Sequence, residues 1–303
     1  MYSKPERMQP RNYPDEALLA RLAKVKLADA QIPEHEFLQF RRLQALVYTL
    51  RLAGFDLEAM QTEALVGATQ ACQVRGRVMV TRCEFDMEIT DEIVAQVMPR
   101  LYPDAVWLTS NASASHPRVG GLPLGLSDYC GYRLIHPIIG DSGKFDQLLR
   151  ENPRREKNLV LMNFNDQTYP VLRGAVRRIY SPLSFVTSGN YGADEAGYAA
   201  YVADLRSHAF ALAPRGAGVD THRIWESLYA GTIPISQKES ALRWFQDLPI
   251  LFLDRWDEGV DIGRLEQVRD EFHRREWDLR KLTVSYWYSL ILKLLNTPAS
   301  QYT

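Results

Sequence analysis

The chain has 303 residues, with 36 Lys and Arg against 37 Asp and Glu, and 46% of its residues are hydrophobic. A length of this order accommodates one large or two ordinary globular domains, and two are favoured. The formal net charge of -1 excludes the strongly basic character that is typical of nucleic-acid-binding proteins, so we expect no nucleic acid partner. No apolar run reaches the roughly 18 residues that cross a bilayer, so we expect no transmembrane segment.

The cysteines bear on the compartment in which the protein works. Cys72, Cys83 and Cys130 are widely spaced and form no Cys-x-x-Cys pair, a pattern that favours free thiols over disulfides or a zinc site. The N-terminal stretch MYSKPERMQPRNYPDE is polar and lacks the apolar segment of a secretory signal. We therefore expect a cytoplasmic protein without a bound metal or other cofactor, and peripheral attachment to a membrane stays open.

In the first part of the chain, helical patterns are followed by an alternation of strands and helices. Helices are predicted by apolar residues three or four positions apart, and strands by short runs of apolar and β-branched residues. Strands that alternate with helices are typical of a parallel α/β sheet. The expected elements are helices over 15–27, 34–53, 57–72 and 90–101, strands over 77–81 and 105–109, and a strand or buried loop over 119–126.

The stretch 137–157 is rich in Gly, Asp, Pro, Arg and Lys, and we expect a domain boundary there. We therefore divide the chain into an N-terminal domain, 1–150, and a C-terminal domain, 151–303, whose last helix can pack back on the first. Residues 158–163 form a nearly continuous apolar run, as expected of a strand covered on both faces. The other expected elements are helices over 166–180 and 197–208, strands over 185–187, 210–213, 233–235 and 249–253, and a helical segment over 264–296 with one break.

Residues 210–235, FALAPRGAGVDTHRIWESLYAGTIPI, contain a strand, a glycine-rich turn, a helix, a glycine stop and a second strand. This succession predicts one compact strand-helix-strand unit. The turn at Arg215–Gly218 lets a ligand approach the backbone closely, because glycine has no side chain. Asp220 or Thr221 is expected to cap the helix, and Gly231 to end it.

The predicted helix of this unit begins beside several cations. Arg215, His222 and Arg223 near a helix N-terminus predict a site for a phosphate or diphosphate. Glu226, one turn further on, can accept hydrogen bonds from a vicinal diol such as a ribose. The alternative for Arg223 and Glu226 is an ion pair on a solvated helix face. Arg173, on the predicted helix 166–180, either belongs to a solvated face or reaches the same ligand.

Several common motifs are absent. The turn is not a dinucleotide-binding fingerprint, because Gly-x-Gly-x-x-Gly would need a glycine where Thr221 stands. The stretch 140–144, GDSGK, lacks the spacing of a P-loop. No Asp-x-Asp motif occurs, although a metal-dependent nucleotide-sugar site would be expected to have one. A mechanism without a metal ion is therefore favoured.

Residues 210–235 resemble the C-terminal part of exostosin-type glycosyltransferases, and the resemblance is clearest over 158–258. The family signature runs phenylalanine-x-leucine-x-proline-arginine-glycine and continues into a helix with arginine and glutamate. Weaker similarity reaches back to about residue 105, and residues 1–75 lie outside it. The positions that carry the signature are Phe210, Leu212, Pro214, Arg215, Gly216, Gly218, Asp220, Thr221, His222, Arg223, Trp225, Glu226, Gly231 and Ile233-Pro234-Ile235.

The resemblance implies a GT-B fold, in which two Rossmann-like domains face each other across a cleft, here with extra N-terminal helices and a long C-terminal helical segment. It implies that the C-terminal domain binds the nucleotide-sugar donor and that the N-terminal domain binds the acceptor. The implied reaction moves a hexosyl or pentosyl group, with inversion, from a nucleotide-diphosphate donor, expected to be UDP-linked, to a carbohydrate hydroxyl. An oligosaccharide or glycan acceptor, free or lipid-linked, would place the reaction in polysaccharide biosynthesis.

The resemblance also implies roles for residues. Arg215, Arg223 and the backbone of the turn would hold the diphosphate, and Glu226 would bind the ribose hydroxyls. Inverting transfer also needs a base from the N-terminal domain to deprotonate the acceptor hydroxyl. The alternative function is a non-catalytic nucleotide or sugar-phosphate binding module without such a base. The base candidates are Asp86, Glu84 and His116, and the donor-binding candidates are Arg215, Gly216, Gly218, Asp220, Thr221, His222, Arg223, Glu226 and Arg173.

Overall fold

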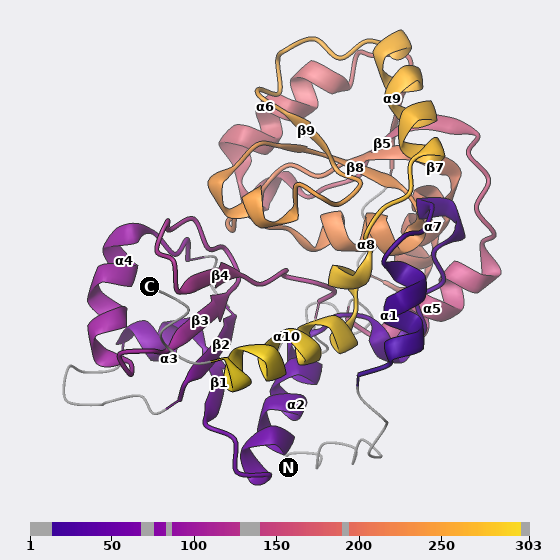
Figure 1. Cartoon of the computed structure of the whole chain (residues 1–303). Helices are drawn as coiled ribbons and strands as arrows, with labels where there is room; N and C mark the ends of the chain where they lie inside the picture. Colours follow the sequence, from indigo (N-terminus) through magenta and orange to yellow (C-terminus); the bar gives the residue numbers. More distant parts are fainter. Residues whose placement is uncertain (1–13, 68–75, 83–86, 128–139, 190–193, 298–303) are drawn as a thin grey trace.

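The computed structural model describes residues 14–67, 76–82, 87–127, 140–189 and 194–297 (Figure 1). Within them the chain is an α/β protein with two parallel sheets, a first sheet of four strands and a second sheet of five. The elements of the first part are α1 (Glu16–Leu22), η1 (Leu27–Asp29), η2 (Glu34–Glu36), α2 (Phe40–Leu52), β1 (Leu57–Gln61), α3 (Thr62–Gly67), β2 (Val78–Arg82), α4 (Asp91–Val97), η3 (Met98–Arg100), β3 (Val106–Thr109) and β4 (Val119–Gly121), where η marks a short 3₁₀ helix.

The second part of the chain continues the alternation of helices and strands. Among the helices within the described ranges, none is long and apolar enough to cross a membrane. The elements are α5 (Ser142–Glu151), β5 (Asn158–Met162), η4 (Asp166–Thr168), α6 (Pro170–Tyr180), β6 (Val186–Ser188), α7 (Glu195–Ser207), β7 (His208–Leu212), α8 (His222–Ala230), β8 (Ile233–Gln237), η5 (Ser240–Phe245), β9 (Leu251–Leu253), α9 (Ile262–Arg274), η6 (Arg280–Leu282) and α10 (Val284–Asn296).

All the paired strands run parallel, in the order β1-β2-β3-β4 in the first sheet and β6-β5-β7-β8-β9 in the second. From β5 the chain moves outward to β6 and then returns past β5 to β7. The direction of strand addition therefore reverses between β5 and β7. Every residue of β7 is buried, as expected of a central strand covered on both faces.

The segment 57–72, predicted as a helix, begins with a strand. β1 pairs with β2 over its full length, and α3 follows it directly. The sequence Leu-Glu-Ala-Met-Gln has good intrinsic helix propensity, but pairing with β2 and the burial of Leu57 favour the extended form. The helix prediction for 57–61 is therefore wrong, while residues 68–72 lie outside the described part of the chain.

The stretch 137–157, where a domain boundary is expected, contains α5. Asp141 caps this helix by accepting a hydrogen bond from the backbone N–H of Lys144 at 2.9 Å. Phe145 and Leu148 are buried on one face, and charged residues cover the other. The polar composition of the stretch conceals this amphipathic helix, which the sequence pattern did not indicate, and the domain boundary stays a prediction.

The strand-helix-strand unit predicted over 210–235 is confirmed. β7, α8 and β8 follow one another, and Gly231 ends α8 with a φ of 76°, in the left-handed region that glycine adopts without strain. The break predicted within 264–296 is also confirmed, since α9 ends at Arg274 and α10 begins at Val284. Both predictions depend on local signals, which the chain carries at these positions without help from distant contacts.

The two ends of the chain are exchanged between the sheets (Figure 1). α1 packs into the core of the second sheet through Leu18 and Leu22, and Phe37 joins the same core. α10 packs against α2 and β2, in the core of the first sheet, through Trp287 and Ile291. Each core therefore contains a segment from the opposite end of the chain.

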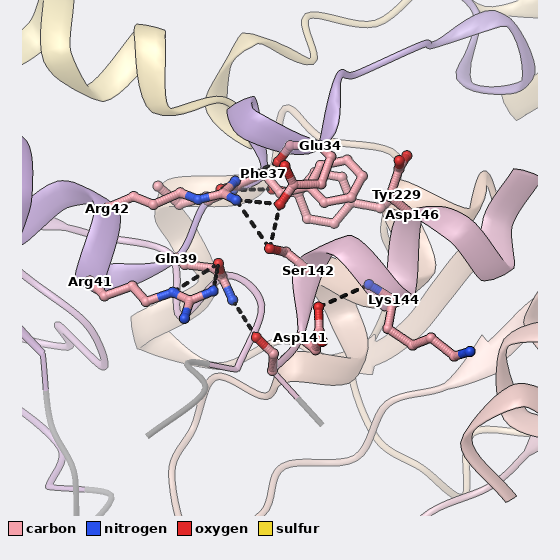
Figure 2. A network of polar contacts seen from close by, with 12 residues as sticks. Glu34, Phe37, Gln39, Arg41, Arg42, Asp141, Ser142, Lys144, Asp146 and Tyr229 are labelled. Atoms are coloured by element: carbon pink, nitrogen blue, oxygen red, sulfur yellow. Dashed lines mark hydrogen bonds and ion pairs between the residues drawn. The ribbon is translucent and has the colours of Figure 1, made fainter. Parts of the chain in front are cut away.

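Polar side chains fix the chain where it passes from one sheet to the other. The hydroxyl of Tyr229 accepts a hydrogen bond from the Leu38 N–H at 2.8 Å and donates one to the Leu282 carbonyl at 2.6 Å. Nearby, Gln39 Nε2 donates to the Gly140 carbonyl at 2.9 Å (Figure 2). These bonds join segments far apart in the sequence and hold the two sheets in one relative position.

A charged cluster joins η2, α2 and α5 at the same place (Figure 2). Arg42 donates to the Glu34 carboxylate and to Ser142 Oγ, and Ser142 Oγ donates to Glu34 Oε1 at 2.5 Å. Burial acts to raise the pKa of Glu34, but the hydrogen bond from Ser142 and the charge of Arg42 outweigh it and lower the pKa below its ordinary value. Glu34 is therefore held as a carboxylate.

Replacing Glu34 by glutamine is expected to lower the free energy of unfolding by about 1–3 kcal/mol at pH 7, because the largely buried Arg42 loses its charged partner. The folded-state pKa of Glu34 lies below the unfolded value, so its contribution is present above about pH 4.3 and is lost as the pH falls through the folded-state pKa. Urea denaturation of both proteins at pH 7 and pH 3 measures the effect. An equal difference at the two pH values would contradict it.

Candidate functional site

The carboxyl ends of the two sheets contact each other. The loops that follow β3 and β4 meet those that follow β7 and β8, as in the hydrogen bond from the Asp220 N–H to Asn111 Oδ1 at 2.9 Å. At the end of β4, Gly121 leaves room for the Trp244 ring, because a Cβ at this glycine would lie 2.2 Å from the indole. Open parallel sheets bind ligands beyond the carboxyl ends of their strands, so this interface is the candidate site.

Within the interface, one position is favoured by topology. The strand order of the second sheet reverses between β5 and β7, and open α/β sheets bind ligands at such a reversal. We call the carboxyl-end position between these strands the switch point. Residues 163–169 lead from β5 towards α6, and residues 213–221 lead from β7 to α8, so both helices begin on this side of the sheet.

Arg173 of α6 joins the two loops at the switch point. Its guanidinium donates to the carbonyls of Asn165, Pro214 and Arg215 at 2.8, 3.0 and 3.0 Å. The residue is only 7% exposed, so the solvated-face interpretation of Arg173 is wrong. Because three of its N–H groups donate to these carbonyls, Arg173 fixes the spacing between the two loops.

Arg215 lies at the switch point with a partly exposed guanidinium. Its Cζ is 5.4 Å from the centre of the Tyr169 ring, and its Nη1 is 3.8 Å from Glu88 Oε2, in the loop that follows β2. The neighbouring Gly216 is half-buried, and a Cβ there would lie 3.2 Å from an Arg173 nitrogen. Gly218, two residues on, is buried. Of the predicted turn, Arg215 and Gly216 are therefore the residues placed to meet a ligand.

The carboxyl group of Asp220 makes its hydrogen bonds within the protein. Its carboxyl group is buried and accepts hydrogen bonds from the Leu124 N–H at 2.7 Å and from Trp225 Nε1 at 2.9 Å. Burial raises the pKa of Asp220 to about 7, against these bonds and one from the Thr221 N–H. Thr221 is the N-cap residue of α8 but makes no side-chain cap bond. The beginning of α8, predicted as the anion site, thus faces a carboxyl group of the chain itself.

His222 is held as a neutral imidazole. Its Nδ1 donates to the Gly125 carbonyl at 2.8 Å, and its Nε2 lies 3.4 Å from Arg82 Nη2. Burial and the charge of Arg82 lower the pKa of His222 to about 3. Of these two residues, only Arg82, at the end of β2, is positively charged, and His222 adds no charge to the first turn of α8.

Arg223 and Glu226 form a cluster with α7. The Arg223 guanidinium lies 4.6 Å from the centre of the Tyr201 ring, and the Tyr201 hydroxyl donates to Glu226 Oε2 at 2.7 Å. Glu226 is 7% exposed, and burial raises its pKa against the charge of Arg223 and this hydrogen bond. The solvated ion-pair interpretation is therefore wrong, because the carboxylate faces the interior.

Of the three base candidates, only His116 lies within the described residues. Asp86 and Glu84 lie outside the described residues. His116 is half-buried against α4, and its Nδ1 accepts the Arg118 N–H at 3.1 Å. The Arg118 carbonyl in turn accepts the N–H of Trp107 near the start of β3, so His116 lies towards the amino end of the first sheet. This position is away from Arg215, and the structure does not bring the two residues together.

Four residues at the interface escaped sequence analysis: Arg82, Glu88, Tyr169 and Glu239. Glu88 stands two positions after the candidate Asp86 in the sequence, so a set of candidates extended by two residues would have included it. Glu239 follows β8. Burial raises its pKa, the charge of Arg215 opposes this rise, and the Glu88 carboxylate adds to it. Both carboxylates thus act on the one guanidinium of Arg215.

Comparisons with protein-family models and with curated protein sequences found no match for this chain. Among the described residues there is also no group of three or more His, Cys, Asp or Glu side chains arranged to hold a metal ion. The interpretation of the site therefore depends on its own geometry and on the resemblance of residues 210–235.

Proposed function

We propose that the protein is a glycosyltransferase of the GT-B type, which moves a sugar from a nucleotide-diphosphate donor to a carbohydrate hydroxyl, with inversion and without a metal ion. One observation carries the proposal. Arg215 and Gly216 lie at the switch point of the second sheet, and the loops at the carboxyl end of the first sheet meet them there. Such an arrangement can hold a donor on one sheet and present an acceptor from the other.

In the proposed complex, the diphosphate binds to Arg215 and to the backbone at Gly216, beside the switch point. The guanidinium offers paired N–H donors to phosphate oxygens and neutralises the charge that develops as the nucleotide leaves. Arg173 keeps the backbone of this loop in place without touching the donor. Glu226, whose carboxylate is buried against Tyr201, takes no part in this contact.

Nucleotide binding tests the proposal. A nucleotide at about 100 times its dissociation constant adds roughly 2.7 kcal/mol of stability, so UDP, GDP, CMP and dTDP are compared by thermal shift. We expect UDP to raise the melting temperature of the wild type and to have little effect on Arg215→Ala. Arg150→Ala, at an exposed ion pair of α5, is the control and is expected to respond like the wild type. If none of the four nucleotides shifts the wild type, the proposal fails.

Glu226→Gln is expected to leave UDP binding close to that of the wild type, because the carboxylate is buried and directed at Tyr201. The amide keeps the shape of the side chain, so the fold should be retained. Isothermal titration with UDP and with 2′,3′-dideoxy-UDP measures the effect. A loss of UDP affinity in the variant that the dideoxy compound does not share would contradict this expectation and would place Glu226 at the ribose hydroxyls.

A non-catalytic nucleotide-binding module is the alternative. It would share the donor site and would bind UDP in the same way, but it would release no UDP from a UDP-sugar. The two functions therefore differ in whether a base reaches the acceptor hydroxyl.

A further inference from the structure

The loop that follows β2 is fixed against the end of β3. The backbone N–H of Ile89 donates to the Asn111 carbonyl at 2.9 Å, and Ile89 forms an isolated parallel β-bridge with Ala112. Asn111 in turn accepts the Asp220 N–H through its side chain at 2.9 Å. Glu88, next to Ile89, is thereby held on the first sheet in a defined position relative to the second.

From that position the Glu88 carboxylate reaches Arg215. Its Oε2 is 3.8 Å from Arg215 Nη1, and the Glu88 side chain remains 34% exposed. A contact of this length is too long for a hydrogen bond, so the carboxylate lies beside the guanidinium without being tied to it. The carboxylate oxygens therefore stay available to a hydroxyl group that enters between the sheets.

We infer that Glu88 is the general base of the reaction, an inference that depends on the proposed function. When a donor occupies Arg215, the acceptor hydroxyl approaches from the first sheet, where Glu88 lies. The hydroxyl oxygen forms a bond to the anomeric carbon while the bond from that carbon to the phosphate oxygen breaks. The hydroxyl proton passes to the Glu88 carboxylate, and the electron pair of the broken bond leaves with the diphosphate, whose charge Arg215 neutralises.

Glu239 differs from Glu88 in the sheet to which it belongs. It follows β8 on the second sheet, the sheet that holds the donor in the proposed complex. A base has to approach the anomeric carbon from the side opposite the leaving diphosphate, and the first sheet provides that side. Geometry therefore favours Glu88 over Glu239 as the proton acceptor.

The test measures UDP release from UDP-glucose and UDP-N-acetylglucosamine with water as the acceptor, together with UDP binding by titration. Glu88→Gln is expected to lower kcat by about 10²- to 10⁴-fold, the range for loss of a general base. Its affinity for UDP should be unchanged or higher, because a negative charge beside Arg215 is removed. Glu92→Gln, at the exposed start of α4, is the control expected to keep the wild-type rate.

The outcomes separate the inference from the proposed function. A wild type that binds no UDP contradicts the proposed function itself. If the wild type binds UDP but Glu88→Gln keeps the wild-type rate, only the assignment of Glu88 as the base is overturned. The same holds if Glu239→Gln loses rate and Glu88→Gln does not. UDP binding without UDP release by the wild type also overturns it, since this is the behaviour of a binding module without a base.

Discussion

Arg173→Met is expected to lower the free energy of unfolding by about 3–5 kcal/mol and to abolish nucleotide binding. The methionine fills similar space but leaves the carbonyls of Asn165, Pro214 and Arg215 without their donor, and each buried carbonyl that loses its partner costs about 1–3 kcal/mol. The two loops at the switch point then lose their fixed spacing. Guanidinium chloride denaturation and titration with UDP measure the two effects.

Arg178→Met, on the exposed side of the same helix, is the matched control and should stay within about 0.5 kcal/mol of the wild type. Arg173→Lys keeps the charge but cannot reach all three carbonyls, so an intermediate loss of stability is expected. If Arg173→Met folds with wild-type stability and binds UDP normally, the positioning role of Arg173 is wrong.

Asp220→Ala is expected to destabilise the protein by a similar amount, about 3–5 kcal/mol, because the N–H groups of Leu124 and Trp225 lose a buried acceptor. Leu124 follows β4 of the first sheet and Trp225 lies in α8 beside the second, so the variant should also loosen the contact between the sheets. Chemical denaturation gives the first effect, and the susceptibility of the native protein to proteolysis gives the second. Asp257→Ala, at an exposed carboxylate paired with Arg255, serves as the control.

Asp220 should also make stability depend on pH. Its folded-state pKa of about 7 lies above the unfolded value near 3.9, so the folded protein binds more protons between these values. The contribution of Asp220 is therefore fully present below about pH 4 and is lost as the pH rises to about 7. Asp220→Asn cannot ionise, and the difference in unfolding free energy between wild type and this variant should fall over that interval. A difference that stays constant from pH 4 to pH 8 would contradict the assignment.

Local signals account for what the sequence predicted well. The unit 210–235 was recognised because an apolar strand, a glycine turn and a glycine stop are encoded by neighbouring residues. The strand at 57–61 was missed because Leu-Glu-Ala-Met-Gln favours a helix on its own, and only pairing with β2 makes it extended. Intrinsic propensity is a weak guide wherever a distant strand decides the conformation.

In the candidate site, too, the sequence revealed the residues that local signals mark and not those that distant contacts position. The sequence marked Arg215 and Gly216, which the structure places at the switch point. It could not reveal that Asp220 meets Leu124 and Asn111, about a hundred residues away, because nothing near Asp220 encodes those contacts. The burial of Arg173 was hidden for the same reason, since its three acceptors lie on two loops that only the sheet topology brings together.

The exchange of chain ends constrains the order in which the protein can fold during synthesis. The first sheet and α2 leave the ribosome well before α10, so Leu43, Val47 and Val80 cannot be fully covered until α10 has been synthesised. The buried carboxylate of Glu36 likewise lacks its donor, the backbone N–H of Ser285, until the chain has grown 249 residues further. Contacts of such long range slow folding. The nascent chain should therefore keep part of the first sheet's apolar core exposed until α10 is made.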